Sequence, residues 1–201
     1  GDKADTREIA EQVIEAFAGF DFIVAPSGSC GAMMKKHYPE LFAGDPAWEP
    51  RAKAFADKCH ELVSFLTDVM MVRDTGASVS AEVTYHDSCS GLRELGIKDQ
   101  PRKLLNAVEG ITVKEMKDPD VCCGFGGTFC VKYPDISNAI VTKKTGNIEG
   151  SEAEMLLAGD LGCLMNMAGK LKRSGSTVEV RHVAEVLAGM TDTPPIAGSG
   201  K

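Results

Sequence analysis

Short apolar segments alternate along this chain with segments of helical periodicity, and this alternation limits the possible folds more than any other feature of the sequence. The predicted strands cover residues 20–25, 79–85, 111–116, 155–158 and 177–181. The predicted helices cover residues 9–17, 47–69, 101–108, 136–148 and 183–187. Strands that alternate with helices are typical of βαβ units, in which the strands pair in parallel. We therefore predict an α/β fold, with a mostly parallel sheet and helices on both of its faces.

Cysteines follow four of these predicted strands. The four loops carry Cys30, Cys89, the adjacent pair Cys122 and Cys123, and Cys163. Because the loops that leave the carboxyl ends of parallel strands gather at one edge of a sheet, we expect these thiols to meet at that edge. Cys59 is the exception, since it is predicted to lie in the middle of the helix over residues 47–69. There it is expected to pack as a small apolar side chain.

Composition narrows the possible roles of the thiols. Seven cysteines cannot all pair, and the polar residues 1–8 do not form a signal peptide. No apolar run approaches the roughly 20 residues that span a bilayer. We therefore expect a cytoplasmic protein without a transmembrane segment, whose cysteines serve metal binding or redox chemistry. The net charge of −7 gives little support for nucleic-acid binding.

The chain also contains an internal repeat. Residues 22–34 parallel residues 155–167, because each segment has a strand, a glycine-containing turn, a cysteine and several methionines. Cysteines that precede the second copy have no counterpart before the first. We therefore predict that residues 1–75 are the C-terminal part of a first repeat, that residues 76–190 are a complete second repeat, and that N-terminal sequence is missing. Residues 191–201, rich in Pro and Gly, are predicted to be a flexible tail.

The cysteines of the second repeat have the spacing C-x32-CC-x39-C. Zinc sites usually show C-x2–4-C pairs, and ferredoxins show a run of closely spaced cysteines; this spacing matches neither. Four thiolates on three loops suit an iron–sulfur cluster. Gly124, Gly126 and Gly127 would let backbone N–H groups approach its sulfur atoms. Structural zinc bound by the same four thiolates stays open as an alternative.

Several loops resemble those of the cysteine-rich CCG domain family, which includes the cysteine-rich subunit of heterodisulfide reductase and the iron–sulfur subunits of glycolate and glycerol-3-phosphate oxidases. The resemblance covers residues 1–190. It is carried by the sequences PSGSC at 26–30, HDSC at 86–89, CCGFGGTF at 122–129, GCLMN at 162–166 and HVAEV at 182–186. Agreement in five separate loops is specific to this family.

The resemblance implies a cofactor and a role. Cys89, Cys122, Cys123 and Cys163 would bind a 4Fe–4S cluster, cubane or non-cubane, with Gly124 beside it. The chain would be the electron-transfer subunit of a system, of lactate dehydrogenase type, that oxidises L-lactate or a related 2-hydroxy acid. Its partners would be companion oxidoreductase subunits, and no catalytic residue is assigned in this chain. Thiol–disulfide redox chemistry at the cluster, as in heterodisulfide reductase, is the other alternative that the family offers.

The sequence departs from the family pattern, which is two copies of C, CC and CxxC. Ser27 and Asp160 stand where the first cysteine of each CxxC is expected. Asp160 is interpreted as an oxygen ligand, as a hydrogen-bond acceptor near the ligands, or as a turn residue. Cys30 would be the last ligand of a first site, the rest of which is not in this chain. Cys130 has no expected partner.

Two histidines at strand ends complete the candidates. His86 and His182 are both expected to be hydrogen-bonding structural residues. Of the two, His86 is the better candidate for tuning a cluster.

Overall fold

The computed structural model describes residues 2–198, and within them the strands form two parallel sheets. The larger sheet has the strand order β4-β3-β5-β6, and the smaller one pairs β1 with β2. The strands are β1 (Ile23–Ala25), β2 (Cys59–Glu61), β3 (Ser78–Tyr85), β4 (Glu109–Val113), β5 (Met155–Ala158) and β6 (Glu179–His182). The predicted α/β class with parallel strands is confirmed. The strands are nevertheless divided between two sheets, whereas the prediction joined them in one.

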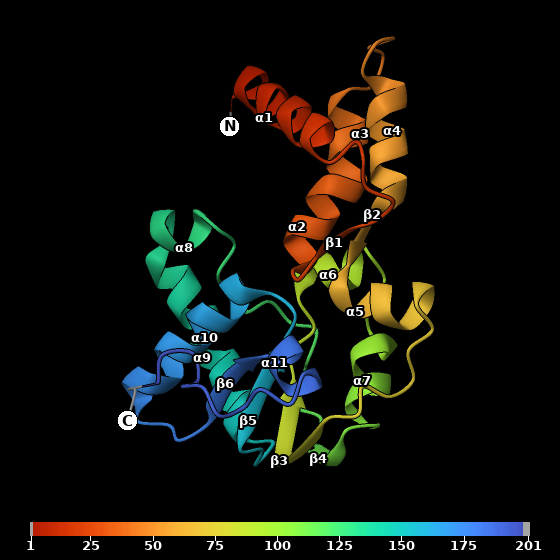
Figure 1. The fold of residues 1–201 in the computed structure, drawn as a ribbon. Helices are drawn as coiled ribbons and strands as arrows, with labels where there is room; N and C mark the ends of the chain where they lie inside the picture. The colour runs from red at the N-terminus through yellow and green to blue at the C-terminus, as the bar shows by residue number, and fades with distance from the viewer. Residues whose placement is uncertain (1, 199–201) are drawn as a thin grey trace.

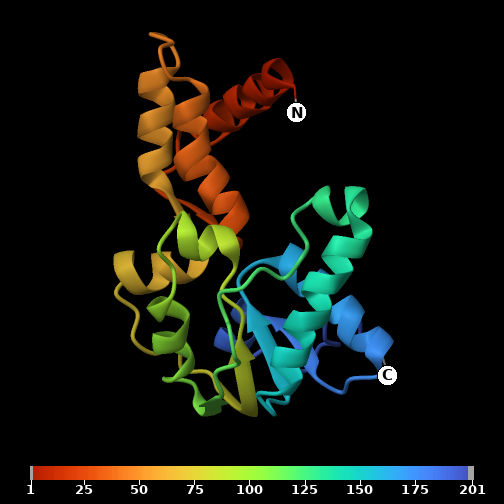
Figure 2. The same ribbon diagram turned by 180° about the vertical axis from the view of Figure 1, so that it is seen from behind.

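Helices cover both faces of the larger sheet, as predicted (Figures 1 and 2). The helices on the two faces are α7 (Asp99–Leu105) and α11 (Val183–Leu187) on one, and α9 (Pro134–Glu149) and α10 (Leu161–Ser174) on the other. The short helices α6 (Cys89–Arg93) and α8 (Phe129–Lys132) pack against α2 (Gly28–Ala32) and α9 respectively. On the central strand β5, Met155 and Leu157 pack in one core with α7 and α11, and Leu156 and Ala158 pack in a second core with α9 and α10. Successive side chains of a strand point to opposite faces, so β5 is buried on both.

The smaller sheet belongs to a separate helical unit, coloured red to orange in Figure 1. Its helical segments are α1 (Lys3–Ala16), α2 (Gly28–Ala32), η1 (Met33–His37), α3 (Tyr38–Leu41) and α4 (Glu49–Lys58). Helix α1 begins at a cap in which Asp2 accepts the N–H groups of Ala4 and Asp5. Its buried Ala10 and Ile14 lie one turn apart and pack in a core centred on Phe42.

The helix predicted over residues 47–69 is wrong. Helix α4 ends at Lys58, β2 follows at once, and the chain then continues through α5 (Leu62–Ser64) and η2 (Phe65–Val69). Cys59 therefore starts a strand, where it lies opposite Ile23 of β1. The apolar side chains keep helical spacing because the segments before and after β2 each bury one face. Pairing with β1, a contact distant in sequence, imposes the strand between them.

The two units meet where β1 and β5 end. The Gly28 N–H donates to the Gly159 carbonyl at 3.3 Å, and His182 Nε2 donates to the Pro26 carbonyl at 2.9 Å. Helix α2 packs directly against α6, the helix that begins with Cys89. The carboxyl ends of strands from both sheets therefore face one another at this junction.

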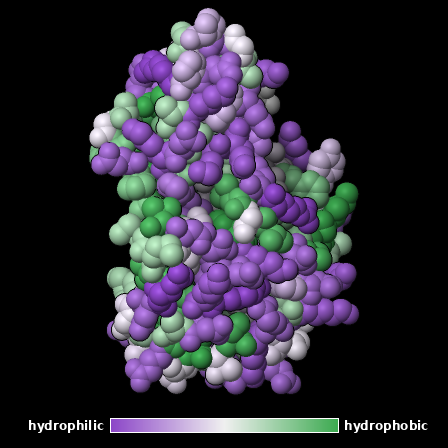
Figure 3. All heavy atoms as spheres, turned by 90° about the vertical axis from the view of Figure 1, so that its right-hand side faces the viewer, coloured by the Kyte–Doolittle hydropathy of each residue, from purple (hydrophilic) through white to green (hydrophobic). Residues whose placement is uncertain are grey.

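Figure 3 shows the side of the molecule that carries α4, α5 and α7. This surface is mostly hydrophilic, with apolar side chains gathered at mid-height.

The C-terminal segment contacts the larger sheet. The Ile196 N–H donates to the Val180 carbonyl of β6 at 2.9 Å, and Lys172 of α10 donates to the Ala197 carbonyl at 2.8 Å. Residues 199–201 of the predicted tail lie outside the described residues. In the part of the chain that the structure describes, no helix combines the length and the apolar character that crossing a bilayer requires.

Candidate metal centre

The loop after β3 continues the sheet before it turns. The His86 N–H donates to the Leu157 carbonyl at 2.9 Å, and the Asp87 N–H donates to the Pro119 carbonyl at 3.1 Å. Ser88 then caps α6, since its hydroxyl accepts the Gly91 N–H at 3.3 Å. These bonds fix the backbone on both sides of the turn, so that Cys89 starts α6 in a defined position.

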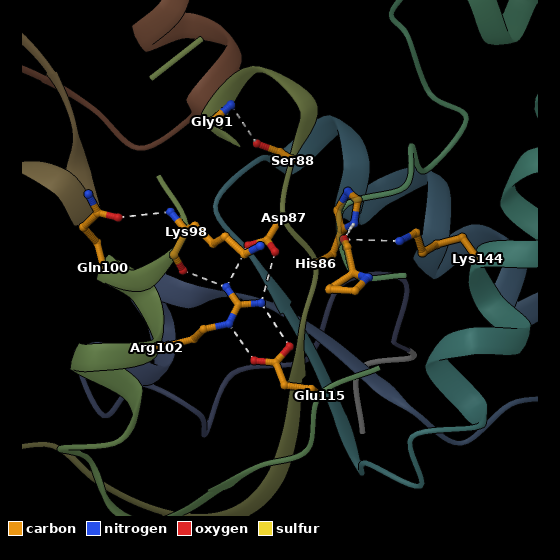
Figure 4. A network of polar contacts seen from close by, with 10 residues as sticks. His86, Asp87, Ser88, Gly91, Lys98, Gln100, Arg102, Glu115 and Lys144 are labelled. Atoms are coloured by element: carbon orange, nitrogen blue, oxygen red, sulfur yellow. Dashed lines mark hydrogen bonds and ion pairs between the residues drawn. The ribbon is translucent and has the colours of Figure 1, made fainter. Parts of the chain in front are cut away.

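A charged network holds the same loop from the side (Figure 4). The buried Asp87 accepts two hydrogen bonds from the Arg102 guanidinium of α7, at 2.8 and 3.1 Å. Arg102 also donates to both carboxylate oxygens of Glu115, at 2.6 and 3.0 Å. Paired bonds of this kind fix orientation as well as distance. Asp87 is thereby tied to α7 and to the segment after β4.

The glycine after the cysteine pair is required by the backbone. Gly124 has a φ of +86°, and a Cβ atom on it would lie 2.7 Å from the Ser137 carbonyl oxygen of α9. Its N–H donates to Cys122 Sγ at 3.3 Å, and the backbone of Phe125 acts on Cys123 in the direction that lowers the pKa of this thiol. The loop therefore brings its backbone close to two cysteine sulfur atoms, while the approach of N–H groups to the sulfur atoms of a cluster stays a prediction.

The four predicted thiols form one connected network. The thiols of Cys89 and Cys122, of Cys122 and Cys123, and of Cys123 and Cys163 interact closely enough to shift one another's pKa. Interaction with Cys123 and Cys89 lowers the pKa of Cys122, and interaction with Cys123 lowers the pKa of Cys163. Interaction with Cys122 raises the pKa of both Cys89 and Cys123. Two sulfur atoms are thus favoured as thiolates, the form that binds metals.

His86 faces this network from the end of β3. One of its ring nitrogens and the Sγ atoms of Cys123 and Cys163 lie within 4.8 Å of one another. Nδ1 lies 3.2 Å from the Pro119 carbonyl, which can only accept, so Nδ1 carries the hydrogen. Nε2 is fully buried and has no hydrogen-bond partner among the described residues. A lone pair is therefore available beside two sulfur atoms.

This donor set fits a metal centre. It offers four cysteine sulfurs and an imidazole nitrogen, which are ligands for iron–sulfur clusters and for zinc. The buried Nε2 atom of His86 makes no hydrogen bond among the described residues, but His86 lies close enough to Cys163 to lower its pKa, so this nitrogen belongs to the same donor set. Cys123 and Cys163 are buried, whereas Cys89 and Cys122 are only partly so. One side of the centre is consequently closer to solvent than the other.

The remaining candidates lie apart from the network. Cys30 is exposed on α2, in the other unit, because its strand β1 belongs to the smaller sheet. Cys59 is fully buried in the apolar core of that unit, which confirms its packing role. Cys130 donates to the Gly127 carbonyl from α8. His182 caps α11, since its Nδ1 accepts the Ala184 N–H, so its structural role is confirmed.

Asp160 joins the two units. Its Oδ2 accepts the Ser29 N–H at 3.0 Å and the Ser27 hydroxyl at 3.2 Å. The two residues that replace the first cysteine of each CxxC thus hydrogen-bond to each other. Asp160 also stands directly before α10 and adds negative charge near Cys163. In this structure its carboxylate serves as a hydrogen-bond acceptor between the units.

Sequence reasoning missed two residues that support the site. Lys144 of α9 is fully buried and donates to the Asp118 and Pro119 carbonyls. Asn166 of α10 donates to the Cys123 carbonyl at 2.9 Å. The signal for Lys144 is present in the sequence, because it lies three residues after Val141 and four before Ile148, both on the buried face of α9.

Comparison with known proteins agrees with this architecture. A family model described as a cysteine-rich domain (CCG) matches residues 83–168, which contain all four thiols of the network. Lactate utilization protein A of Geobacillus kaustophilus is 48% identical over 183 residues, which are 91% of this chain and 76% of that protein. Lactate utilization protein A of Oceanobacillus iheyensis is 45% identical, with 91% of this chain and 75% of that protein covered.

A third relative shows the same extent of similarity. Lactate utilization protein A of an Exiguobacterium species is 48% identical over 185 residues, which are 91% of this chain and 75% of that protein. Identity at this level over three quarters of each relative, together with the cysteine-rich domain match, identifies the family. The chain belongs to the Lactate utilization protein A family.

Proposed function

We propose that this chain is the electron-transfer subunit of a lactate-utilization system, and that Cys89, Cys122, Cys123 and Cys163 hold an iron–sulfur cluster. The observation that carries the proposal is that these four thiols form one group of interacting side chains, although they come from three segments far apart in the sequence. The relatives' name, Lactate utilization protein A, supports the assignment of this chain to a lactate-utilization system. Companion oxidoreductase subunits would act on the 2-hydroxy acid and exchange electrons with this chain.

The chain's own residues would hold the cluster and set its surroundings. The bound cluster supplies one-electron redox chemistry. The Gly124 amide donates to Cys122 Sγ, and such a bond stabilises negative charge on the sulfur atom. The partly exposed Cys89 and Cys122 mark the side at which a partner would approach. In this proposal the protein works in the cytoplasm, whose reducing conditions keep thiols free.

Anaerobic reconstitution with iron and sulfide tests the proposal. We expect broad visible absorption that dithionite bleaches, an electron paramagnetic resonance signal on reduction, and bound iron and sulfide. Cys123→Ser should abolish cluster loading, because it removes the thiol that links Cys122 to Cys163. Cys59→Ser is the matched control, since Cys59 is equally buried but lies in the other core. Equal iron content in the two variants would contradict the ligand assignment.

A mononuclear zinc site is the second candidate. It is favoured by the group of His86, Cys123 and Cys163, whose ligand atoms lie within 4.8 Å of one another. Zinc with cysteine and histidine ligands would be structural and silent in redox experiments. Protein isolated without oxygen would then contain one zinc and neither iron nor sulfide. His86→Ala would release that zinc, whereas an iron–sulfur cluster held by four thiolates would survive this substitution.

A further inference from the structure

Lys144 is a buried cation with no carboxylate partner. Its side chain has no exposed surface, and Nζ donates to the carbonyls of Asp118 at 2.6 Å and Pro119 at 3.3 Å. It forms no ion pair within residues 2–198, whereas its neighbour Lys143 is 69% exposed and lies 4.0 Å from the Asp118 carboxylate. Lysine is almost never fully buried unless it is paired. The fold thus keeps a lysine in the interior with no carboxylate in ion-pair contact among the described residues.

The surroundings of Lys144 point to the thiol network. Burial lowers the pKa of Lys144, and among the charged groups around it Cys123 opposes this effect most strongly, ahead of Asp120 and Asp118. Taking a charge out of water is costly unless an opposite charge lies nearby. The free thiols carry only part of the negative charge that four thiolates of a loaded site would carry. A loaded site would therefore supply the counter-ion that the ammonium lacks.

One backbone oxygen ties Lys144 to the centre. The Pro119 carbonyl accepts Lys144 Nζ, His86 Nδ1 at 3.2 Å and the Asp87 N–H at 3.1 Å. Figure 4 shows the Lys144 side chain extending from α9 toward His86. Because a ring nitrogen of His86 lies within 4.8 Å of the Cys123 and Cys163 sulfur atoms, the ammonium is connected to them through one carbonyl and one ring. This arrangement fixes the position of the charge relative to the thiols.

We propose that Lys144 is the buried counter-charge of the metal centre and raises its reduction potential. The inference rests on the proposed function, since it requires a redox cluster on the four thiols. Reduction adds one negative charge to the centre. A fixed ammonium nearby stabilises the reduced form more than the oxidised form, and the low local dielectric strengthens the effect. Lys144 would act through its charge alone, because its hydrogen bonds go to backbone carbonyls and not to the sulfur atoms that would bind the cluster.

The test compares reduction midpoints of reconstituted variants. Lys144→Met and Lys144→Gln remove the charge, and the glutamine keeps an N–H donor for the carbonyls. Both should make the cluster at least tenfold harder to reduce, which is about 59 mV for one electron. Lys144→Arg keeps the charge and should stay near the wild-type midpoint. Lys143→Met is the matched control, because it removes an exposed charge from the adjacent position.

The readouts separate the inference from the proposed function. Redox titration followed by electron paramagnetic resonance gives the midpoint, and iron and sulfide analysis gives the loading of each variant. Wild-type protein without iron would refute the proposed function itself. Equal midpoints at equal loading in wild type, Lys144→Gln and Lys143→Met would overturn the role of Lys144 alone. If Lys144→Met and Lys144→Gln lose the cluster and Lys144→Arg retains it, the positive charge is required to hold the cluster, which supports the inference. If all three variants lose the cluster, Lys144 has a packing role and the inference is overturned.

Discussion

At the scale of single residues, the ion pair of Asp87 and Arg102 holds the loop on which Cys89 and His86 lie. Asp87 is buried, and both of its carboxylate oxygens are bound by Arg102. We expect Arg102→Met to lower the free energy of unfolding by about 3 kcal/mol, because it leaves a buried carboxylate without its cation. Chemical denaturation of the metal-free protein measures the loss.

The neighbouring position supplies the control for this prediction. Lys103 is exposed on the same helix, so Lys103→Met should change the free energy of unfolding by less than about 0.5 kcal/mol. Arg102→Met should also reduce cluster loading, since the loop is released from α7. A variant as stable as Lys103→Met would show that the Asp87 carboxylate finds another partner or takes up a proton at little cost.

The residues of the candidate site could be predicted from the sequence to a large extent. Parallel strands bring their carboxyl-end loops to one edge, and this rule placed Cys89, the cysteine pair and Cys163 together without any coordinates. It failed for Cys30, because strand β1 pairs in a different sheet. It gave no information on Lys144, whose charge argues for a surface position although its place on α9 is buried. In both cases the position of the side chain is decided by contacts with segments that are distant in the sequence.

At the scale of elements, α2 and α6 approach each other through glycines. A Cβ atom on Gly28 would lie 2.8 Å from the Gly91 nitrogen and 2.9 Å from its Cα. These are backbone atoms, which cannot move aside as a flexible side chain would. We therefore expect Gly28→Ala to separate the helices and to lower the free energy of unfolding by about 1–3 kcal/mol. Thermal unfolding of the variant measures the effect.

An exposed helical glycine provides the comparison. Gly146 lies in α9, and a Cβ atom there would meet nothing within 4 Å. Gly146→Ala should raise the free energy of unfolding by up to about 1 kcal/mol, because alanine favours the helix. Opposite signs for the two substitutions would show that close approach, and not glycine replacement as such, is responsible. A neutral or stabilising Gly28→Ala would contradict the tight contact between α2 and α6.

The helix predicted over residues 47–69 is interrupted in the structure by strand β2. Local periodicity predicts which side of a segment is buried, and it correctly placed Phe55 and Cys59 inside. It does not indicate where a helix stops when no glycine or proline marks the end. Strand β2 has three residues and exists through its pairing with β1, some 36 positions earlier at the Ile23 and Cys59 pair. Such a contact is invisible to any local pattern.

At the scale of the whole molecule, corresponding parts of the two units occupy corresponding places. Ala25 pairs with Glu61 in the smaller sheet, and Ala158 pairs with His182 in the larger one. Glu61 and His182 then each cap the next helix, by accepting the N–H of Ser64 and of Ala184 respectively. This correspondence supports the proposal that residues 1–75 and 76–190 are copies of one repeated unit.

The division into sheet and loops determines how the molecule should respond to loss of its metal. The four thiols lie where three strands give way to the next segment, with Cys89 in the first position of α6 and Cys163 in the first turn of α10, whereas β3 and β5 are held by backbone pairing and by two apolar cores. Removing the metal from reconstituted protein with a chelator should therefore increase amide hydrogen exchange in the thiol loops, residues 86–90, 118–131 and 160–163. Exchange in β3 and β5 should change little.

Hydrogen-exchange mass spectrometry of loaded and chelator-treated protein measures this difference segment by segment. The smaller sheet is an internal reference, because β1 and β2 carry none of the four thiols. Cys123→Ser, which should not load, is expected to match the chelator-treated pattern before any chelator is added. An increase spread evenly over both sheets would instead show that the metal stabilises the global fold, and unchanged exchange in all three loops would place the metal elsewhere.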